Sequence, residues 1–153
     1  MATTASPQPR AEIDDLMTGA QYLESLRDAR EVYIYGERVP DVTTHAAFRN
    51  GARSIMRLYD TLHDPAQRDL LTTVDDYGIR THKFFAPSKS SAELLAARDA
   101  IAAWARLSYG FMGRTPDYKA AFMASLGANP EFYAPFGNNA LAWYKKFAAR
   151  GLF

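Results

Sequence analysis

The chain contains no cysteine, which excludes disulfides, thiolate metal sites and cysteine nucleophiles together. It also has no apolar run near the ~18 residues that a membrane span requires. The N-terminal stretch MATTASPQPRAEIDD lacks the apolar core of a signal peptide. We therefore expect a cytoplasmic protein, with residues 1–16 as a disordered lead-in and residues 17–153 as one helical domain.

Neither sign of charge predominates, because 18 basic and 17 acidic residues leave a net charge of +1. No basic block stands out, which argues against a nucleic-acid partner. The sequence also lacks a P-loop, a dinucleotide fingerprint and a nucleophile elbow. What remains is an ordinary globular composition of 153 residues, with 48% hydrophobic and an above-average 13% aromatic residues.

Metal binding is not expected. The spacing of His45, His63 and His82 matches no metal-binding motif. His45 and His63 lie near opposite ends of one predicted helix, which favours a surface or capping role. Asp75-Asp76 falls in a predicted turn, where neighbouring carboxylates are usually solvated.

The apolar spacing predicts a mainly helical fold with small β elements. Thr18 and Gln21 form a capping box that begins a helix over 19–30. Residues 32–35 and 38–42 flank Gly36-Glu37 and predict a β-hairpin. Residues 72–74 and 79–85 are predicted strands. Further helices are predicted over 45–62, from Asp64-Pro65 to about Leu71, from Ser90 to about Tyr109, from Thr115 to Gly127, and from Asn138 or Asn139 to Gly151.

The stretch YGFMGRTPDYKAAF at 109–122 carries the candidate site. Its glycines and Thr115-Pro116 are explained by one helix ending and another beginning, with Arg114 a solvated loop residue. Alternatively, Arg114 precedes a helix N-terminus, whose free N–H groups favour an anion. Tyr118 would then lie in the first turn and point at the same position. Such a site could stabilise a carboxylate, a phosphate or a phenolate, and the residues alone leave both readings open.

Three stretches give the chain a family resemblance: MTGAQYLESLRDAREVYIYGERVPDVTTHAAF (17–48), LYDTLHDP (58–65) and YGFMGRTPDY (109–118). They resemble the N-terminal part of the 4-hydroxyphenylacetate 3-monooxygenase large-subunit family, which are two-component, flavin-dependent phenol hydroxylases. The resemblance runs from Met17 to the C-terminus. It implies a mainly α (α+β) fold, namely the helical N-terminal domain of an acyl-CoA-dehydrogenase-like flavoprotein monooxygenase with a small β-hairpin.

The resemblance also implies an activity. The family hydroxylates a phenol ortho to its hydroxyl, using O2 and FADH2 that a separate reductase supplies, and its complete enzymes are commonly homotetramers. In its GR-x-PDY segment an arginine and a tyrosine contact the phenol oxygen, together with a histidine. Carried over, these are Arg114 and Tyr118. Ionising the phenol raises electron density at the ortho carbon, so a cation and a hydrogen-bond donor serve the reaction.

One departure from the family concerns that histidine. In the family it lies in a Thr-His stretch just beyond the helix that ends here near Arg150. The central β-rich and C-terminal helical domains, which contact the flavin, are also absent. We therefore expect the FAD contacts beyond Phe153, and a chain that is inactive alone, as a fragment or a truncated gene product. The sequence does not identify the phenol.

Two other interpretations stay open. The chain could be a truncated, non-catalytic helical interaction module, which would show an exposed apolar surface. It could also be a segment of a flavoprotein like 4-hydroxybutyryl-CoA dehydratase. That enzyme uses an iron–sulfur cluster, whose cysteine ligands this chain lacks.

Overall fold

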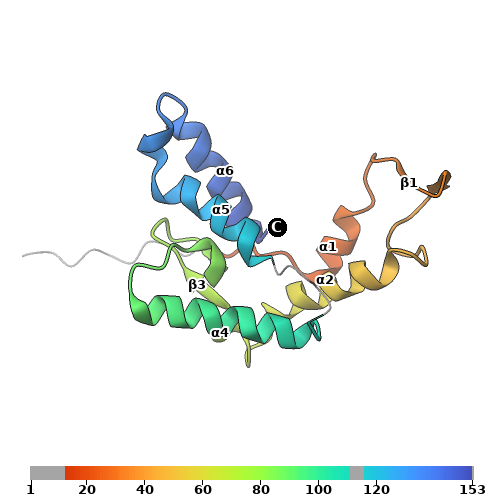
Figure 1. Ribbon diagram of the computed structural model, residues 1–153, viewed down its shortest axis with the longest axis horizontal. Coiled ribbons are helices and arrows are strands. Elements are labelled where there is room, and N and C mark those ends of the chain that lie inside the picture. The colour runs from red at the N-terminus through yellow and green to blue at the C-terminus, as the bar shows by residue number, and fades with distance from the viewer. Residues whose placement is uncertain (1–12, 111–115, 153) are drawn as a thin grey trace, which may run out of the picture.

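The computed structural model describes residues 13–110 and 116–152, and these confirm the mainly helical prediction (Figure 1). Helices and short strands alternate without a large sheet. The elements are α1 (Gly19–Ser25), β1 (Val32–Ile34), β2 (Glu37–Val39), α2 (Arg49–Thr61), α3 (Arg68–Leu71), β3 (Thr72–Val74), β4 (Arg80–His82), the 3-10 helix η1 (Lys83–Phe85), α4 (Ser91–Leu107), α5 (Asp117–Ala128), the 3-10 helix η2 (Pro130–Tyr133) and α6 (Gly137–Arg150).

The described chain begins beside β4 and then enters the core. Ile13 is half-exposed and forms a parallel bridge with Ile79, whereas Leu16 and Met17 are buried. Thr18 then begins α1 with the predicted capping box.

Helix α1 is shorter than predicted and ends at Ser25. The Asp28 carboxylate accepts the backbone N–H of Arg30 at 3.0 Å, and such a local bond competes with helix formation. At its other end α1 lies against α2, where the Gly19 N–H donates to the Asp60 carboxylate at 2.7 Å. The two helices therefore form one packed unit.

Helix α2 begins at Arg49 instead of residue 45. The preceding residues form turns, in which the Asp41 carboxylate accepts the Thr43 backbone N–H at 2.7 Å. His45 Nδ1 accepts the Ala47 N–H at 3.2 Å within these turns, and α2 itself has no side-chain cap. Side chains that bind nearby backbone groups thus delay the helix.

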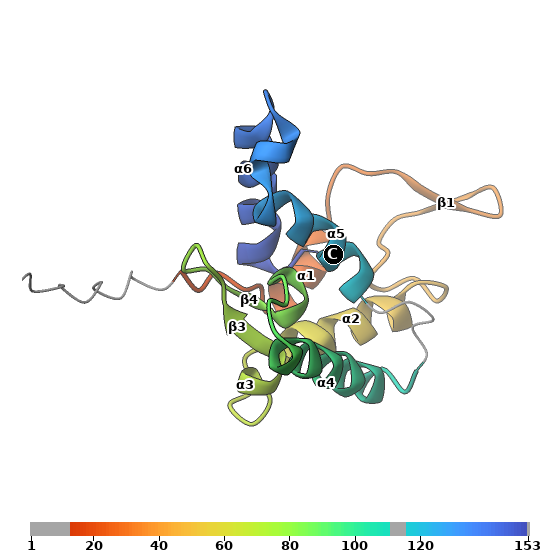
Figure 2. The same ribbon diagram turned by 60° about the vertical axis from the view of Figure 1, so that its left-hand side comes forward.

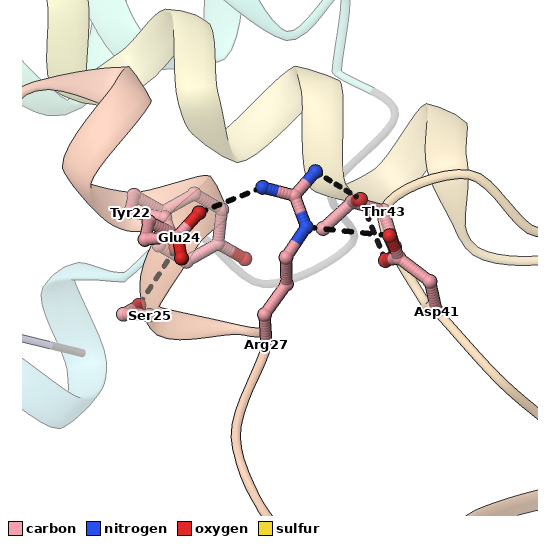
Figure 3. A network of polar contacts seen from close by, with 6 residues as sticks. All are labelled: Tyr22, Glu24, Ser25, Arg27, Asp41 and Thr43. Carbon is pink, nitrogen blue, oxygen red and sulfur yellow. Dashed lines mark hydrogen bonds and ion pairs between the residues drawn. The ribbon is translucent and has the colours of Figure 1, made fainter.

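Strands β1 and β2 form the predicted hairpin, which extends away from the helices in both views (Figures 1 and 2). Tyr35 and Gly36 have φ values of 53° and 84°, as a type I′ turn requires. Arg27 connects α1 to the segment after β2 (Figure 3): its guanidinium binds Glu24 at 2.7 Å, Asp41 at 3.3 Å and the Thr43 hydroxyl at 3.1 Å. These bonds hold the base of the hairpin against α1.

Strands β3 and β4 form a second antiparallel hairpin, in which Thr72 pairs with His82. The predicted strand over 79–85 is only partly correct, because residues 83–85 form η1. Phe84 and Phe85 are both buried, whereas successive side chains of a strand point to opposite faces. The 3-10 turn directs both rings into the core.

The core lies where α2, α4, α6 and the β3–β4 hairpin meet. Its most completely buried large side chains include Tyr59, Phe85, Trp104 and Tyr144. Gly151 ends α6 in the left-handed conformation, and its carbonyl accepts the Tyr59 hydroxyl at 2.9 Å. The end of α6 is therefore tied to α2. In the described ranges, no helix has the length and apolar character to cross a membrane.

Candidate functional site

The candidate site lies where α4 gives way to α5. Helix α4 ends at Leu107, and Tyr109 and Gly110 follow with positive φ values of 54° and 66°. Residues 111–115, which include the predicted site residue Arg114, lie outside the described residues. Pro116 is buried, and α5 begins at Asp117, one residue later than predicted. The structure thus places Tyr118 in the first turn of α5 and gives no position for Arg114.

Helix α5 buries small residues and exposes two aromatic ones, while Met123 and Leu126 lie partly buried against the core. Ala120 and Ala124 are buried, and a Cβ added to Gly127 would lie 2.5 Å from the Tyr144 ring. Tyr118 and Phe122 are 53% and 67% exposed. Their spacing of four residues places them on the same side of the helix, away from the buried alanines. The aromatic side of α5 is therefore its solvent-facing side.

Asp117 modifies the role expected of the helix N-terminus. Burial raises the pKa of the Asp117 carboxyl, while hydrogen bonds from its own backbone N–H and that of Tyr118 act in the opposite direction. A carboxylate of the chain itself therefore lies beside the N–H groups that were expected to favour an anionic ligand.

An open groove separates α4 from α5. Leu94, Ala97 and Ile101 form its wall on α4, and Asp117 and Ala121 form part of its wall on α5. Phe84 of η1 also lines it. The groove is mostly apolar and begins beside the first turn of α5, so it adjoins the candidate site.

A second, smaller pocket of about 140 Å³ lies between the β3–β4 turn, α5 and α6. Its polar groups are already paired, as Lys89 binds Asp76 and the Tyr144 hydroxyl binds Asp75. Pockets for small organic ligands usually occupy roughly 300–1,000 Å³. This pocket is therefore too small and too internally satisfied to hold a flavin.

Neither hollow has the lining typical of an FAD site. No glycine-rich loop lines either one, and the two lysines at the smaller pocket, Lys83 and Lys89, already bind the Leu70 carbonyl and the Asp76 carboxylate. Across residues 13–110 and 116–152, no three His, Asp or Glu side chains come together as metal ligands. The prediction that flavin contacts lie beyond Phe153 stays a prediction.

His82 is a buried residue to which the sequence assigned no role. Its ring stacks on Phe84 at 5.2 Å and meets the Trp104 ring edge-on at 4.3 Å. Burial lowers the pKa of His82 to about 3, against a hydrogen bond with the Leu71 backbone. This histidine is a neutral part of the core, and the nearby Phe84-Phe85 was the signal in the sequence.

Comparison with known proteins identifies the family. Residues 18–153 match the family model described as "4-hydroxyphenylacetate 3-hydroxylase N terminal". The pyoverdin chromophore biosynthetic protein PvcC of Pseudomonas aeruginosa is 61% identical over 90% of this chain and 27% of its own length. The 4-hydroxyphenylacetate 3-monooxygenase oxygenase component of Klebsiella oxytoca is 56% identical over 94% of this chain and 28% of its own length. The chain thus spans just over a quarter of these relatives.

Solved structures agree with this assignment. The oxygenase component of a 4-hydroxyphenylacetate 3-monooxygenase, complexed with FAD and 4-hydroxyphenylacetate, matches with a TM-score of 0.77 and 34% identity. The match covers 86% of this chain and 28% of that one. An archaeal 4-hydroxybutyryl-CoA dehydratase shares the fold, with a TM-score of 0.68, 18% identity and coverage of 87% and 27%. The chain belongs to the 4-hydroxyphenylacetate 3-hydroxylase family, to whose N-terminal part it corresponds.

Proposed function

We propose that the chain is the substrate-side N-terminal part of an FADH2-dependent aromatic hydroxylase, which adds oxygen ortho to a phenol hydroxyl. The observation that carries this proposal is the half-exposed Tyr118 in the first turn of α5, four residues after the arginine of the family motif. Family membership over residues 18–153 supports it. The substrate would resemble 4-hydroxyphenylacetate, which names several of the relatives.

In this proposal the two site residues act on the phenol oxygen. Tyr118 donates a hydrogen bond to it, and the Arg114 guanidinium stabilises the phenolate. Charge-assisted hydrogen bonds of this kind are roughly twice as strong as neutral ones. Ionisation raises electron density at the ortho carbon, where the new bond forms. Reduced FAD, when bound, supplies the activated oxygen.

Several further parts of the proposal concern the complete enzyme. A partner reductase would supply the reduced flavin, and O2 would be the second substrate. Assembly as a homotetramer, a cytoplasmic location and the division into a lead-in over 1–16 and a helical domain over 17–153 also stay predictions.

The test uses the polypeptide expressed from its complete coding sequence, together with a flavin reductase, NADH, FAD and 4-hydroxyphenylacetate. Catechol formed per NADH consumed measures the coupling of flavin oxidation to hydroxylation. We expect Arg114→Ala to lower coupling at least tenfold and to release hydrogen peroxide instead. Arg98→Ala is the control, because Arg98 is an exposed arginine of α4 whose guanidinium binds the neighbouring Asp99. If Arg114→Ala hydroxylates as well as the parent, the assigned role is wrong.

A second experiment concerns the 153-residue chain alone. We expect it neither to bind FAD tightly nor to hydroxylate phenols, because we expect the flavin contacts to lie beyond Phe153. Phenol turnover by this chain with reductase and NADH would show that the cofactor site had been misplaced.

A non-catalytic helical interaction module is the second candidate. The observation in its favour is the exposure of Phe132, Phe136 and Trp143 on η2, at the start of α6 and within α6. Exposed apolar groups of this size often mark a protein interface. Two measurements separate the candidates: sedimentation of the 153-residue chain, and titration of the polypeptide from the complete coding sequence with FAD and a phenol. A module self-associates, and its longer form binds neither ligand.

A further inference from the structure

We propose that Phe122 binds the aromatic ring of the phenol while Tyr118 binds its oxygen. This inference rests on the proposed function, and it adds a specificity-determining residue to a site otherwise defined by contacts to one oxygen atom. The ligand class is a phenol or a related aryl compound that presents a flat apolar face.

The geometry of α5 carries the inference. Tyr118 and Phe122 are four residues apart, so their Cβ atoms lie about 5–6 Å from each other on one side of the helix. Both side chains are more than half exposed. A phenol that binds the Tyr118 hydroxyl and lies along this side of α5 would place its ring against Phe122.

The packing of α5 explains why Phe122 is not simply a core residue. The helix already contacts the core through Ala120 and Ala124, and through Gly127 against Tyr144. Phe122 contributes nothing to that contact, because it projects from the opposite side. A large apolar side chain held out of the core loses the benefit of burial until something covers it.

The turn that carries Phe122 is also well fixed. The Ser125 hydroxyl donates to the Phe122 carbonyl at 2.7 Å and lies 3.4 Å from the Tyr133 hydroxyl. Sites on regular helices hold their groups more accurately than sites on loops. Phe122 is therefore presented on a defined surface, continuous with Tyr118.

Phe132 provides a matched control. It is another exposed phenylalanine, 85% exposed, but it belongs to η2 and not to α5. If exposed phenylalanines in this chain only pack against other parts of a longer polypeptide, then Phe122 and Phe132 should respond alike to substitution. A ring-binding role predicts that only Phe122 affects ligand affinity.

The experiment measures binding by equilibrium dialysis, using the polypeptide expressed from its complete coding sequence. The two probes are 4-hydroxyphenylacetate and phenylacetate, which lacks the phenol oxygen. We expect Phe122→Ala to weaken both probes about tenfold, which corresponds to about 1.4 kcal/mol. Tyr118→Phe should weaken only 4-hydroxyphenylacetate, and Phe132→Ala should weaken neither.

The outcomes are decisive in either direction. A dissociation constant of Phe122→Ala within twofold of the parental value for both probes overturns the inference. An equal loss of affinity in Phe132→Ala, or no binding by the parent, also overturns it. If circular dichroism shows that Phe122→Ala is unfolded, Phe122→Leu decides, because it keeps an apolar side chain and should weaken both probes about threefold. Failure of the proposed function looks different: the parent would bind both probes and Phe122→Ala would weaken them, yet no catechol would form.

Discussion

The Tyr144 hydroxyl donates a hydrogen bond to the Asp75 carboxylate, 2.5 Å away, although 69 residues separate the two in the chain. The other carboxylate oxygen of Asp75 accepts the backbone N–H groups of Tyr77 and Ile79 at 2.8 and 2.9 Å. Burial, followed by this bond to Asp75, raises the pKa of Tyr144, so the phenol remains protonated and keeps donating. One carboxylate thus shapes the β3–β4 turn and fastens α6 to it.

We expect Tyr144→Phe to lower the free energy of unfolding by about 1–2 kcal/mol, because hydrogen bonds to charged groups contribute in this range. The ring itself stays in place against Gly127. Urea denaturation followed by circular dichroism measures the change. Tyr33→Phe removes a hydroxyl from the exposed hairpin and should leave stability unchanged. Equal stability of Tyr144→Phe and the parent would mean that the bond contributes nothing.

Gly127 and Gly51 both lie in helices, but we expect their substitution by alanine to have opposite effects on stability. A Cβ at Gly127 would lie 2.5 Å from the Tyr144 ring, whereas a Cβ at Gly51 would meet nothing within 4 Å. We expect Gly127→Ala to destabilise the protein by about 1–3 kcal/mol through overpacking. Gly51→Ala should stabilise it by up to about 1 kcal/mol through helix propensity. Thermal unfolding compares the two, and shifts of the same sign would contradict the packing of α5 on α6.

The buried His82 predicts a pH dependence of stability. An unfolded histidine titrates near pH 6.5, whereas burial lowers the pKa of His82 to about 3 in the folded protein. Between these values the unfolded chain binds a proton that the folded chain does not. Stability contributed by the neutral ring is therefore complete above about pH 6.5 and falls as the pH drops toward 3, by at most about 1.4 kcal/mol per pH unit.

Urea midpoints at pH 7.5, 6 and 5 measure this slope in the parent and in His82→Phe. The stability of His82→Phe should change less with pH than that of the parent, by the amount that one proton contributes. This difference does not depend on the absolute stability of the variant. Parallel pH profiles for the parent and His82→Phe would show that another group is responsible.

Arg27 predicts a local effect on the hairpin. Its guanidinium joins Glu24 of α1 to Asp41 and Thr43, which follow β2 (Figure 3). We expect Arg27→Ala to speed amide hydrogen exchange severalfold in residues 32–39, because a two-stranded hairpin alone is marginally stable. Global stability should hardly change, since the side chain is exposed. Hydrogen-exchange mass spectrometry measures the rates, with Arg98→Ala as the control, and unchanged exchange in 32–39 would contradict the role of Arg27.

The local signals in the sequence were sufficient for much of the fold. Thr18 and Ser90 cap their helices as predicted, and Gly36 lies in the hairpin turn. These features depend on residues within a few positions of one another. The prediction that Gly127 ends a helix was wrong, because this glycine lies inside α5 and allows close approach to Tyr144. The position of Gly127 thus depends on contact with a residue of another helix, and the spacing of residues along the sequence does not reveal such a contact.

The same limit applies to the candidate site. The sequence correctly placed Tyr118 in the first turn of a helix. It did not show that burial raises the pKa of the Asp117 carboxyl, because burial depends on residues distant in the chain. Nor did it show that Tyr118 and Phe122 face solvent, since helical spacing alone groups residues on a side without saying which side is buried.

Helix α5 separates two requirements that many helices must meet with the same residues. Its alanines and glycine determine where the helix lies, and its exposed aromatic side chains determine what it presents. A substitution at position 122 therefore changes the surface offered to a ligand without leaving a cavity in the core. Preference among aryl ligands could diverge there while the fold is maintained by Ala120, Ala124 and Gly127 on the opposite side.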